Sequence, residues 1–376
     1  MIRPKRIGLA LTAALAASLS VAGCTSAPVQ SGSPANAAAT AAGQKAAEAA
    51  IAPYIGHPSP FPKFDPLKTL PTGKTVAFIG TPTPFTSVLY GLVQGAGKTM
   101  GVKITQVNAG FAADSIASAF NTVVAQKPDA VIVSGIDMQL WKTQLAELQK
   151  AGIPVAVAGA TGTAAFGIKG AQAAESYSNV AGALVADYVT AKLSTKSQAV
   201  IYTNPELGFT TDEAKAASAE LAKVCPGCSV RSVSIPLATV GNKAPSTIVA
   251  DVQSHPGTTV AIFPNNEVTT GLHAALSAAG LKLALVGVAS APGQLQDIKD
   301  GTQTVGLAFD SPVLAWNLVD EVAREMAGQK LTDYELAGSA VQQFLTSKEI
   351  TFDPSRGWTG YQDFAARYSL AWGVKN

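Results

Sequence analysis

Between residues 74 and 159 the chain alternates short apolar runs with longer amphipathic ones. The short runs are rich in β-branched residues and nearly all apolar, which is typical of parallel strands covered on both faces. The runs between them repeat their apolar positions with a helical period. This strand–helix repetition predicts a doubly wound parallel sheet. The expected strands are 74–80, 102–108, 129–135 and 153–159, and the expected helices are 87–101, 113–127 and 138–152.

The same pattern restarts near residue 179, with a helix at 179–193 that we expect Asn179 to cap. Two consecutive runs, each with its own sheet, predict an α/β protein of two similar lobes. A ligand crevice between the lobes is then the default expectation. The expected second-lobe strands are 198–203, 229–235, 258–264, 283–289 and 303–309, and the helices are 210–224, 245–255, 268–280, 292–301 and 312–328.

The first residues have the pattern of a secretion signal. Arg3, Lys5 and Arg6 precede an uncharged apolar run from Ile7 to Leu19, and "VAGC" ends at Cys24. The run is too short and too Ala-rich for a confident membrane span. "VAGC" resembles the lipobox of bacterial lipoproteins, which implies a signal peptide at 1–23 and lipidation of Cys24. The alternative is a plain signal peptide that contains a cysteine.

Residues 24–73 are expected to be a lipidated tether and linker. Residues 25–50 are rich in Ala, Ser, Gly and Pro, which predicts a flexible tether with a frayed helix near 39–50. Six prolines between Pro53 and Pro71 exclude a helix or a central strand there. Because this segment also carries Tyr54, Phe61 and Phe64, we expect it to lie against the folded body. The alternative is an extended spacer.

Composition narrows the class of partner. The chain has 27 Lys+Arg and 25 Asp+Glu, and removing the three basic residues before Cys24 leaves 24 basic against 25 acidic residues. A near-neutral chain argues against a nucleic-acid partner, since phosphate binding rests on clustered Lys and Arg. The length beyond Cys24 is enough for two ordinary domains.

Cys225 and Cys228 form "CPGC" in a chain that we expect to be exported. An oxidising compartment favours a short structural disulfide. A thioredoxin-like redox pair is the alternative, but such pairs open a helix, where the thiol pKa is lowered. Here the motif follows a helical pattern and precedes a strand. Two cysteines and three scattered histidines supply too few ligands for zinc.

From Lys74 to about Leu345 the chain resembles the type I periplasmic substrate-binding proteins, in the ribose/galactose-binding branch. The segments that carry this resemblance, in the family's order, are "IGTPTPFTSVLYGLVQGAGKTMG", "KPDAVIVSGIDMQLW", "AGIPVAV", "SYSNVAGALVADYV", "VAIFPNNEVTTGLHAALSAAG" and "LVGVASAPGQLQDIKDGTQTVGLAFDSP".

The resemblance implies two lobes joined by a three-crossover hinge, which closes around a ligand at the carboxyl ends of the strands. The N-terminal lobe would be 74–178 plus 311–342, and the C-terminal lobe 179–310 plus 343–376. The hinge strands would lie near Ser176–Asn179, Phe309–Pro312 and Gln342–Leu345. An ABC permease with its ATPase subunits would read the closed form.

The family's binding positions carry over one by one. Each of four positions also has a structural alternative. Asp137 could instead cap its helix, and Phe85 could pack over its helix. Asn265 and Asp310 could serve only loop structure. Trp141 or Trp316 could also line the pocket, although each fits a helix face in the core. The candidate ligand-binding residues are Thr83, Phe85, Thr86, Ser134, Asp137, Phe209, Asp212, Asn265, Asn266 and Asp310.

Several positions depart from a sugar binder. Gly159-Ala160 stands where sugar binders carry an Asp-Arg pair, Ala289 replaces an Asp, and Thr86 replaces an aromatic residue. Phe209 and Asp212 lie where the family places an Arg. Sugars are held by charge-assisted hydrogen bonds together with aromatic faces. Besides a sugar or polyol, a less hydroxylated or partly apolar ligand is therefore a candidate.

Other functions fit the sequence less well. The stretch "GLVQGAG" lacks the spacing of a dinucleotide or phosphate loop, and we expect Gly91, Gly95 and Gly97 to allow close packing on the sheet. No nucleophile elbow is present, and His57, His255 and His273 lie away from the strand-end loops. A related repressor would carry a DNA-binding motif where this chain has its signal and linker. A receptor that feeds a sensor kinase stays an alternative to transport.

The sequence thus predicts a lipid-anchored, extracytoplasmic solute receptor for an ABC importer. We expect a monomer that is not an enzyme, uses no cofactor or metal, and touches the membrane only through its lipid.

Overall fold

The apolar runs of the first half form a parallel sheet of five strands in the order β2-β1-β3-β4-β5. The computed structural model describes residues 34–288 and 291–374. Strands β3 and β4 are buried along their whole length, whereas burial alternates along the edge strand β2. Helices cover both faces only at the centre of the sheet. The strands are β1 (Thr75–Gly80), β2 (Lys103–Asn108), β3 (Ala130–Ser134), β4 (Val155–Ala158) and the unpredicted β5 (Ala171–Gln172).

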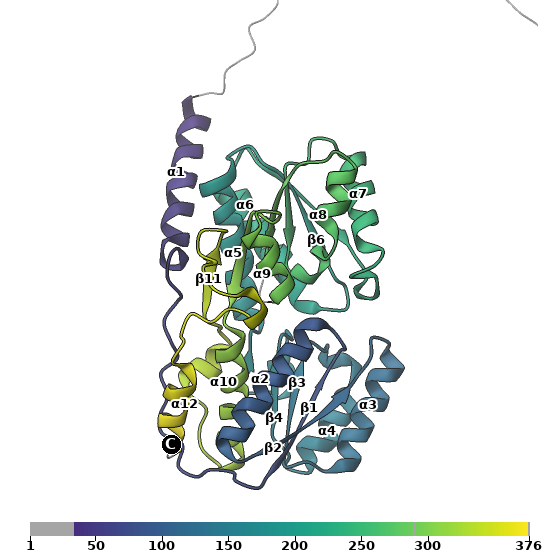
Figure 1. The fold of residues 1–376 in the computed structure, drawn as a ribbon, viewed down its shortest axis with the longest axis vertical. Helices are drawn as coiled ribbons and strands as arrows, with labels where there is room; N and C mark the ends of the chain where they lie inside the picture. The colour runs from purple at the N-terminus through teal and green to yellow at the C-terminus, as the bar shows by residue number, and fades with distance from the viewer. Residues whose placement is uncertain (1–33, 289–290, 375–376) are drawn as a thin grey trace, which may run out of the picture.

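Helices from both ends of the sequence cover this N-terminal lobe (Figure 1). They are α2 (Pro84–Met100), α3 (Ala113–Gln126), α4 (Lys142–Lys150), α10 (Ser311–Met326), α11 (Asp333–Ala337) and α12 (Phe364–Trp372). Only one of the three expected glycines in α2 permits close packing. A Cβ on Gly97 would lie 2.5 Å from Ile104 Cγ1 on β2, whereas Gly91 and Gly95 face open space.

The second half forms a six-stranded sheet in the order β11-β10-β9-β8-β6-β7, in which only β11 is antiparallel to its neighbour. The two lobes and their parallel sheets match the predicted fold class. The strands are β6 (Gln198–Thr203), β7 (Ser229–Ser234), β8 (Val260–Phe263), β9 (Ala284–Gly287), β10 (Val305–Phe309) and β11 (Gln342–Leu345). The helices are α1 (Pro34–Ile51), α5 (Glu175–Tyr188), α6 (Gly208–Val224), α7 (Ala244–Ser254), α8 (Leu272–Ala278) and α9 (Pro292–Lys299).

Helix α5 begins earlier than the sequence predicted. Its first residue is Glu175, and the preceding Ala174 is extended, with no side chain that caps the helix. The expected cap, Asn179, lies inside the helix on an exposed face. The earlier start adds Tyr177 and Ser178 to the buried side of the helix.

The segment expected to be a flexible tether contains the packed helix α1. This helix lies along α5 and α6 of the C-terminal lobe (Figure 1). Its contact with α6 is close, because a Cβ on Gly43 would collide with the carbonyl group of Val224. The small Ala and Gly side chains therefore allow close packing, so the frayed helix expected near 39–50 is a longer helix packed on the lobe.

The proline-rich strap, residues 52–74, leads from α1 to β1 and so passes from one lobe to the other. The amide of Ser59 donates to the carbonyl of Gln342 on β11 at 2.9 Å, and the amide of Leu67 donates to the carbonyl of Ala371 at 2.9 Å. The ring of Phe61 packs on Tyr361 at 5.0 Å. The expectation that this segment lies against the folded body is confirmed.

The C-terminal end crosses the hinge in the opposite direction. Residues beyond β11 first contact the C-terminal lobe, where the turn at Pro354–Arg356 packs on α9. Helix α12 then packs on α10 and α2 of the N-terminal lobe. The expected boundary, which gave 343–376 to the C-terminal lobe, is therefore wrong for the last helix. The chain passes between the two lobes near residues 174, 310 and 340, and it does so again in the strap and before α12.

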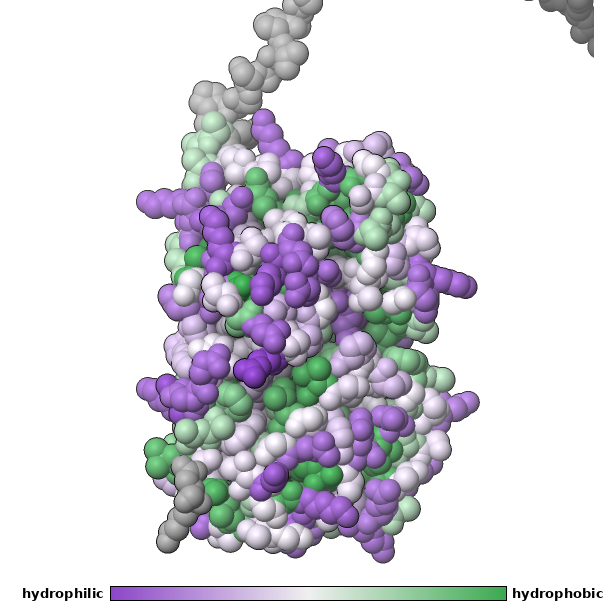
Figure 2. Space-filling view, viewed as in Figure 1, coloured by the Kyte–Doolittle hydropathy of each residue, from purple (hydrophilic) through white to green (hydrophobic). Residues whose placement is uncertain are grey.

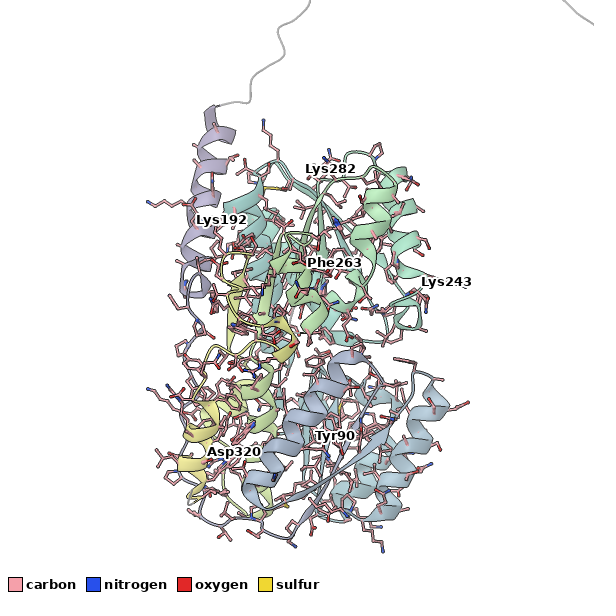
Figure 3. The ribbon with its side chains drawn as sticks, viewed as in Figure 1. Tyr90, Lys192, Lys243, Phe263, Lys282 and Asp320 are labelled. Carbon is pink, nitrogen blue, oxygen red and sulfur yellow. A yellow bond between two sulfur atoms is a disulfide. The ribbon has the colours of Figure 1, made fainter. Side chains whose placement is uncertain are left out.

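A buried charge cluster, formed by Asp320, Arg324 and Glu335, ties these outer segments to α10. Arg324 Nε lies 2.7 Å from Asp320 Oδ2 and 3.7 Å from Glu335 Oε2. Trp372 on α12 donates its Nε1–H to Asp320 at 2.7 Å, and Arg324 Nη2 donates to the carbonyl of Asp65 in the strap at 2.7 Å. Figure 3 labels Asp320 beside α12.

The surface is mixed in character. Figure 2 shows hydrophilic side chains over both lobes on the viewed face, with apolar residues in separate patches between them. Among the described residues, no helix combines the length and hydrophobicity that crossing a bilayer requires.

Candidate functional site

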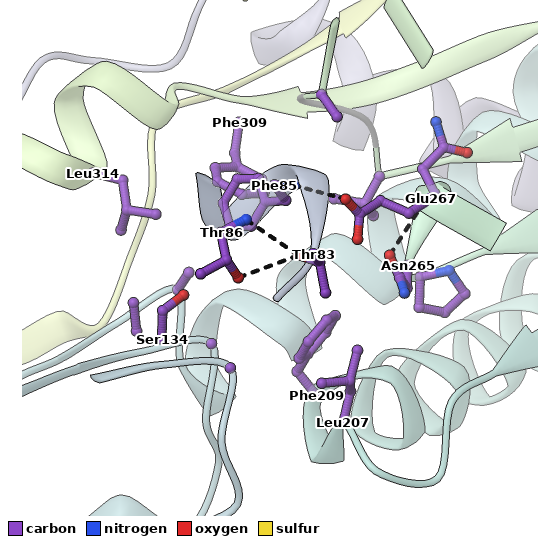
Figure 4. A pocket seen from close by; sticks show the side chains of 18 of the residues that line it. Thr83, Phe85, Thr86, Ser134, Leu207, Phe209, Asn265, Glu267, Phe309 and Leu314 are labelled. Carbon is purple, nitrogen blue, oxygen red and sulfur yellow. Dashed lines mark hydrogen bonds between the residues drawn. The ribbon is translucent and has the colours of Figure 1, made fainter. Parts of the chain in front are cut away.

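A cavity of about 110 Å³ lies between the two lobes, where the carboxyl ends of the strands face each other (Figure 4). Its walls come from the ends of β1, β3, β4 and β10, from the first turns of α2, α5 and α6, and from the loops after β8 and β9. The residues that line it are Thr81, Thr83, Phe85, Thr86, Ser134, Gly135, Ala158, Gly159, Ala173, Tyr177, Leu207, Phe209, Glu213, Pro264, Asn265, Asn266, Glu267, Val288, Ala291, Gln294, Phe309 and Leu314.

The loop between β1 and α2 forms one lip of the cavity. Thr83 caps α2, because its hydroxyl oxygen accepts the amide of Thr86 at 3.1 Å, and Pro84 fits the first helical position. A side chain on Gly80 would meet Thr86, so the strand ends in a residue that leaves room for this turn. Phe85 packs edge-to-face on Phe309 at 5.5 Å. The capped turn thus holds Phe85 at the lip.

Phe85 also connects the two lobes. Its backbone N–H donates to Glu267 Oε1 at 2.7 Å, and Glu267 lies in the turn after β8 of the opposite lobe. Burial raises the pKa of Glu267, and the bond from Phe85 opposes that shift. The lobes therefore already touch across the mouth of the cavity.

Two polar groups at the α5–α6 side of the cavity have no partner. Glu213 is 2% exposed and Tyr177 is 4% exposed, and neither Glu213 Oε1 nor the Tyr177 hydroxyl forms a hydrogen bond within the described structure. Burial raises the pKa of Glu213 well above its ordinary value, and the charge of Asp212 adds to the shift. Burial and the nearby Glu213 raise the pKa of Tyr177. Unsatisfied buried groups are costly, so their position in a cavity indicates a ligand contact.

The two asparagines after β8 line the cavity and each uses one amide N–H inside the lobe. Asn265 Nδ2 donates to Asn204 Oδ1 at 3.0 Å, while Asn265 Oδ1 caps the next turn. Asn266 Nδ2 donates to Gln303 Oε1 at 3.1 Å. Asn266 Oδ1 is buried without a partner. Both residues therefore shape the loop, and each amide nitrogen carries a second N–H.

The structure brings together seven of the ten sequence-predicted residues: Thr83, Phe85, Thr86, Ser134, Phe209, Asn265 and Asn266. The three aspartates lie outside this cavity. Asp137 accepts the amide of Gln139 at 2.8 Å as a helix cap, and Asp212 pairs with Lys215 at 3.4 Å on the surface of α6.

Asp310 is buried in the hinge rather than aimed at a ligand. Its carboxylate accepts the amides of Val313 at 3.0 Å and Gly360 at 2.8 Å, and the hydroxyl of Thr359 at 2.8 Å. Burial raises its pKa to about 6, although these three donors oppose the shift. The expectation that Asp310 reaches the ligand does not match this geometry, because both carboxylate oxygens already have partners.

Neither tryptophan considered for the pocket lines it. Trp141 is fully buried and stacks on Phe120 at 4.2 Å, and Trp316 stacks on Trp372 at 5.1 Å. Ala289, noted as a departure from the family, lies outside the described residues.

Sequence reasoning missed Tyr177, Glu213, Glu267 and Phe309 among the cavity residues. Glu213 follows Phe209 by four residues on α6, so helical spacing could have found it. Glu267 follows the recognised Asn265-Asn266 pair directly. Tyr177 was hidden by the late start assigned to α5.

The remaining cysteine and metal predictions concern other parts of the chain. Cys225 and Cys228 are joined by a disulfide at the C-terminal end of α6, with their Cα atoms 5.3 Å apart. Cys24 lies outside the described residues. Within residues 34–288 and 291–374, no group of three or more His, Cys, Asp and Glu side chains could hold a metal ion.

Known proteins match the chain in two ways. A family model described as "Periplasmic binding protein domain" matches residues 75–330. The chain is also similar to an ABC sugar transporter subunit from Rhodobacter sphaeroides, with 18% identity and a TM-score of 0.63 over 74% of this chain and 99% of that one. No curated protein matches significantly.

Two further solved structures carry ligands. An ABC transporter solute-binding protein from Agrobacterium vitis, bound to α-D-tagatopyranose, matches with 19% identity and a TM-score of 0.64, over 74% of this chain and 96% of that one. A 5-methylthioribose transporter solute-binding protein from Thermotoga lettingae, in complex with 5-methylthioribose, matches with 14% identity and a TM-score of 0.63, over 81% and 96%. At such identities these likenesses show the fold alone.

Proposed function

The chain belongs to the periplasmic binding protein family, which consists of extracytoplasmic solute binders and not enzymes, and we propose that it captures one small molecule for an ABC importer. The observation that carries this proposal is the cavity between the lobes, which buries two polar groups without partners. A ligand enclosed there would contact both lobes and stabilise the closed arrangement. Permease and ATPase subunits would complete the importer.

Capture by closure fits the geometry of the lip. Phe85 belongs to one lobe and the other lobe holds its amide through Glu267 at 2.7 Å. A bound molecule that fills the cavity adds contacts to both sides of this bond. A permease that reads the closed form would then distinguish loaded from empty receptor. Sugars and polyols are candidates because the solved relatives with bound ligands hold such molecules.

The test is a thermal-shift screen of the purified protein with sugars, polyols, nucleosides and small amines. A ligand that binds only the folded state raises the midpoint by mass action. Phe85→Ala removes an apolar wall of the cavity and should abolish most of the shift. The matched control is Phe111→Ala, since Phe111 is an exposed residue of the same lobe. Absence of any shift across the screen would contradict the proposal.

We also propose that Cys24 carries the lipid anchor and that the protein is a monomer. Several acyl chains on one cysteine contribute about 0.8 kcal/mol per buried CH₂, which holds a protein on a membrane. Cys24→Ala should move the protein from the membrane fraction to the soluble fraction without changing ligand affinity. A Cys24→Ala protein that stays in the membrane fraction would contradict the anchor.

A further inference from the structure

The ionisable groups of the cavity all have one sign. Its charged side chains are Glu213 and Glu267, and none of its lining residues is Lys, Arg or His. Lysines that the structure describes on the C-terminal lobe, such as Lys192, Lys243 and Lys282, are exposed and lie on its outside (Figure 3). An anionic ligand would therefore find no positively charged partner among the lining residues.

Part of the cavity's hydrogen-bonding capacity is already used. One N–H each of Asn265 Nδ2, Asn266 Nδ2 and Gln294 Nε2 donates to a protein oxygen, and each amide nitrogen carries a second N–H. Glu213 Oε1 is a buried acceptor without a partner. The hydroxyls of Ser134, Thr86 and Tyr177 can donate or accept. The acidic acceptor Glu213 Oε1 is therefore the group that a donor on the ligand would satisfy.

Aromatic rings form much of the remaining wall. Phe85, Phe209 and Phe309 line the cavity in Figure 4, and Tyr177 packs on Phe309 at 5.8 Å. Rings of this kind attract a cation through the negative potential over their faces and also accept an apolar body. Each hydroxyl of a polyol brings an acceptor that needs a donor, whereas an ammonium group brings donors only.

We propose that this cavity recognises a small organic cation, an amine on a compact apolar body, whose ammonium group lies between Glu213 and Tyr177 and whose body lies among the phenylalanines. This inference rests on the proposed function as a solute receptor and names its ligand class. A body no larger than a single ring suits the volume, since an engineered cavity of about 150 Å³ holds benzene.

Binding of an amine would then favour release of a proton. Burial raises the pKa of the Glu213 carboxyl in the empty protein, and an ammonium group beside it would lower that pKa again. A proton released from the carboxyl goes to solvent, while the ammonium group keeps its own. Tyr177 from α5 and Asp212 from the same helix are the titratable groups that act on Glu213, and Glu267 is the other carboxyl of the cavity.

Calorimetry with benzylamine and benzyl alcohol tests the inference, because the two probes share a shape and differ in charge. Benzylamine should bind at least about tenfold more tightly than benzyl alcohol. Its Kd should fall as pH rises, by at most about tenfold per pH unit, since at most one proton is released. Glu213→Gln should weaken benzylamine at least about tenfold and remove the pH dependence. Glu220→Gln, further along α6, is the matched control and should change neither.

Folding of the Glu213→Gln variant is checked by its thermal midpoint, and Tyr177→Phe provides a second, milder variant that should weaken benzylamine but not benzyl alcohol. If benzyl alcohol, ribose or xylitol binds more tightly than benzylamine, the proposal of a cationic ligand is overturned and the receptor function is left intact. Failure of benzylamine to bind also overturns the cationic ligand. Failure of every amine, sugar and polyol to bind overturns both the cationic ligand and the receptor function.

Discussion

The cavity and the charge cluster of Asp320, Arg324 and Glu335 both bury acidic side chains, but these side chains have different surroundings. On α10, Asp320 bonds to Arg324 and to Trp372, so its two oxygens are used. In the cavity wall, Glu213 Oε1 and the Tyr177 hydroxyl have no partner. The charge cluster also leaves Arg324 Nη1 and Glu335 Oε1 without partners, so an unpartnered buried atom does not by itself mark a binding site. Glu213 differs because it lines a cavity in which a ligand could reach it.

The same contrast applies to Asp310 and Glu213, which both lie near the junction of the lobes. Asp310 has three donors and fixes the start of α10 against residues 359–360. Glu213 lies only one residue from Asp212, the residue named from the family pattern. Burial alone therefore does not identify a binding carboxylate. Glu213 combines an oxygen without a partner with a position in the cavity wall.

The largest expected effect comes from breaking the charge cluster. Arg324→Ala leaves Asp320 and Glu335 buried without their cation and should lower the free energy of unfolding by about 3–5 kcal/mol. Denaturant unfolding measures this change. Lys215→Ala is the control, since Lys215 pairs with Asp212 three residues earlier on the surface of α6, and should cost about 1 kcal/mol or less. Equal losses in the two variants would remove the contrast.

A smaller loss of stability is expected from a substitution at the hinge. Asp310→Asn keeps the shape but places an amide where the carboxylate accepts the Gly360 N–H, so one donor loses its partner. Unfolding should become easier by about 2 kcal/mol, while the affinity for the cavity ligand in the folded protein stays the same. Chemical unfolding and calorimetry measure the two quantities. A tenfold loss of affinity with no loss of stability would assign Asp310 to the ligand after all.

Glu213→Gln should act on stability in the opposite direction and with a pH signature. The unfolded chain ionises Glu213 near its ordinary pKa, whereas the folded protein keeps the proton to higher pH. Wild-type stability contributed by this group is therefore present at low pH and is lost as pH rises above about 4.5, by at most about 1.4 kcal/mol per unit. The thermal midpoint of the variant should exceed that of the wild type by more at pH 8 than at pH 5. A difference independent of pH would be inconsistent with a buried titrating carboxyl.

The smallest effect is expected for Tyr177→Phe in the empty protein. The hydroxyl has no partner, so its removal should change the free energy of unfolding by no more than about 1 kcal/mol, in the stabilising direction. Equilibrium unfolding without ligand measures it. A clear destabilisation would mean that the hydroxyl already bonds to the protein, and the contrast with the charge cluster would weaken.

Much of the fold follows from the sequence because parallel strands covered on both faces leave continuous apolar runs, as at Ala130–Ser134 and Val260–Phe263. The two-residue strand β5 leaves no such pattern. Helix α1 was expected only as a frayed helix near 39–50, for another reason. Its Ala-rich sequence has weak amphipathicity, and it is stabilised by α5 and α6, whose positions the sequence does not state.

The candidate site was predictable where loop position decides it and not where side-chain direction decides it. Thr83, Phe85 and Asn265 follow strand ends, so the edge of the sheet brings them together. Asp137 and Asp310 follow strand ends too, but their carboxylates turn back to cap their own helices. Whether an aspartate caps a helix or faces a ligand depends on a single rotamer, which the residue order does not reveal.

The exchange of terminal helices between lobes has a practical consequence for biosensor engineering. Helix α1 lies on the C-terminal lobe, and α12 lies on the N-terminal lobe (Figure 1). Fluorophores attached before Pro34 and after Trp372 would therefore report on different lobes. Any change in lobe separation would alter energy transfer between the dyes, with no label inserted into either sheet. Dyes at the outer ends of α1 and α12 would therefore give an optical readout of closure.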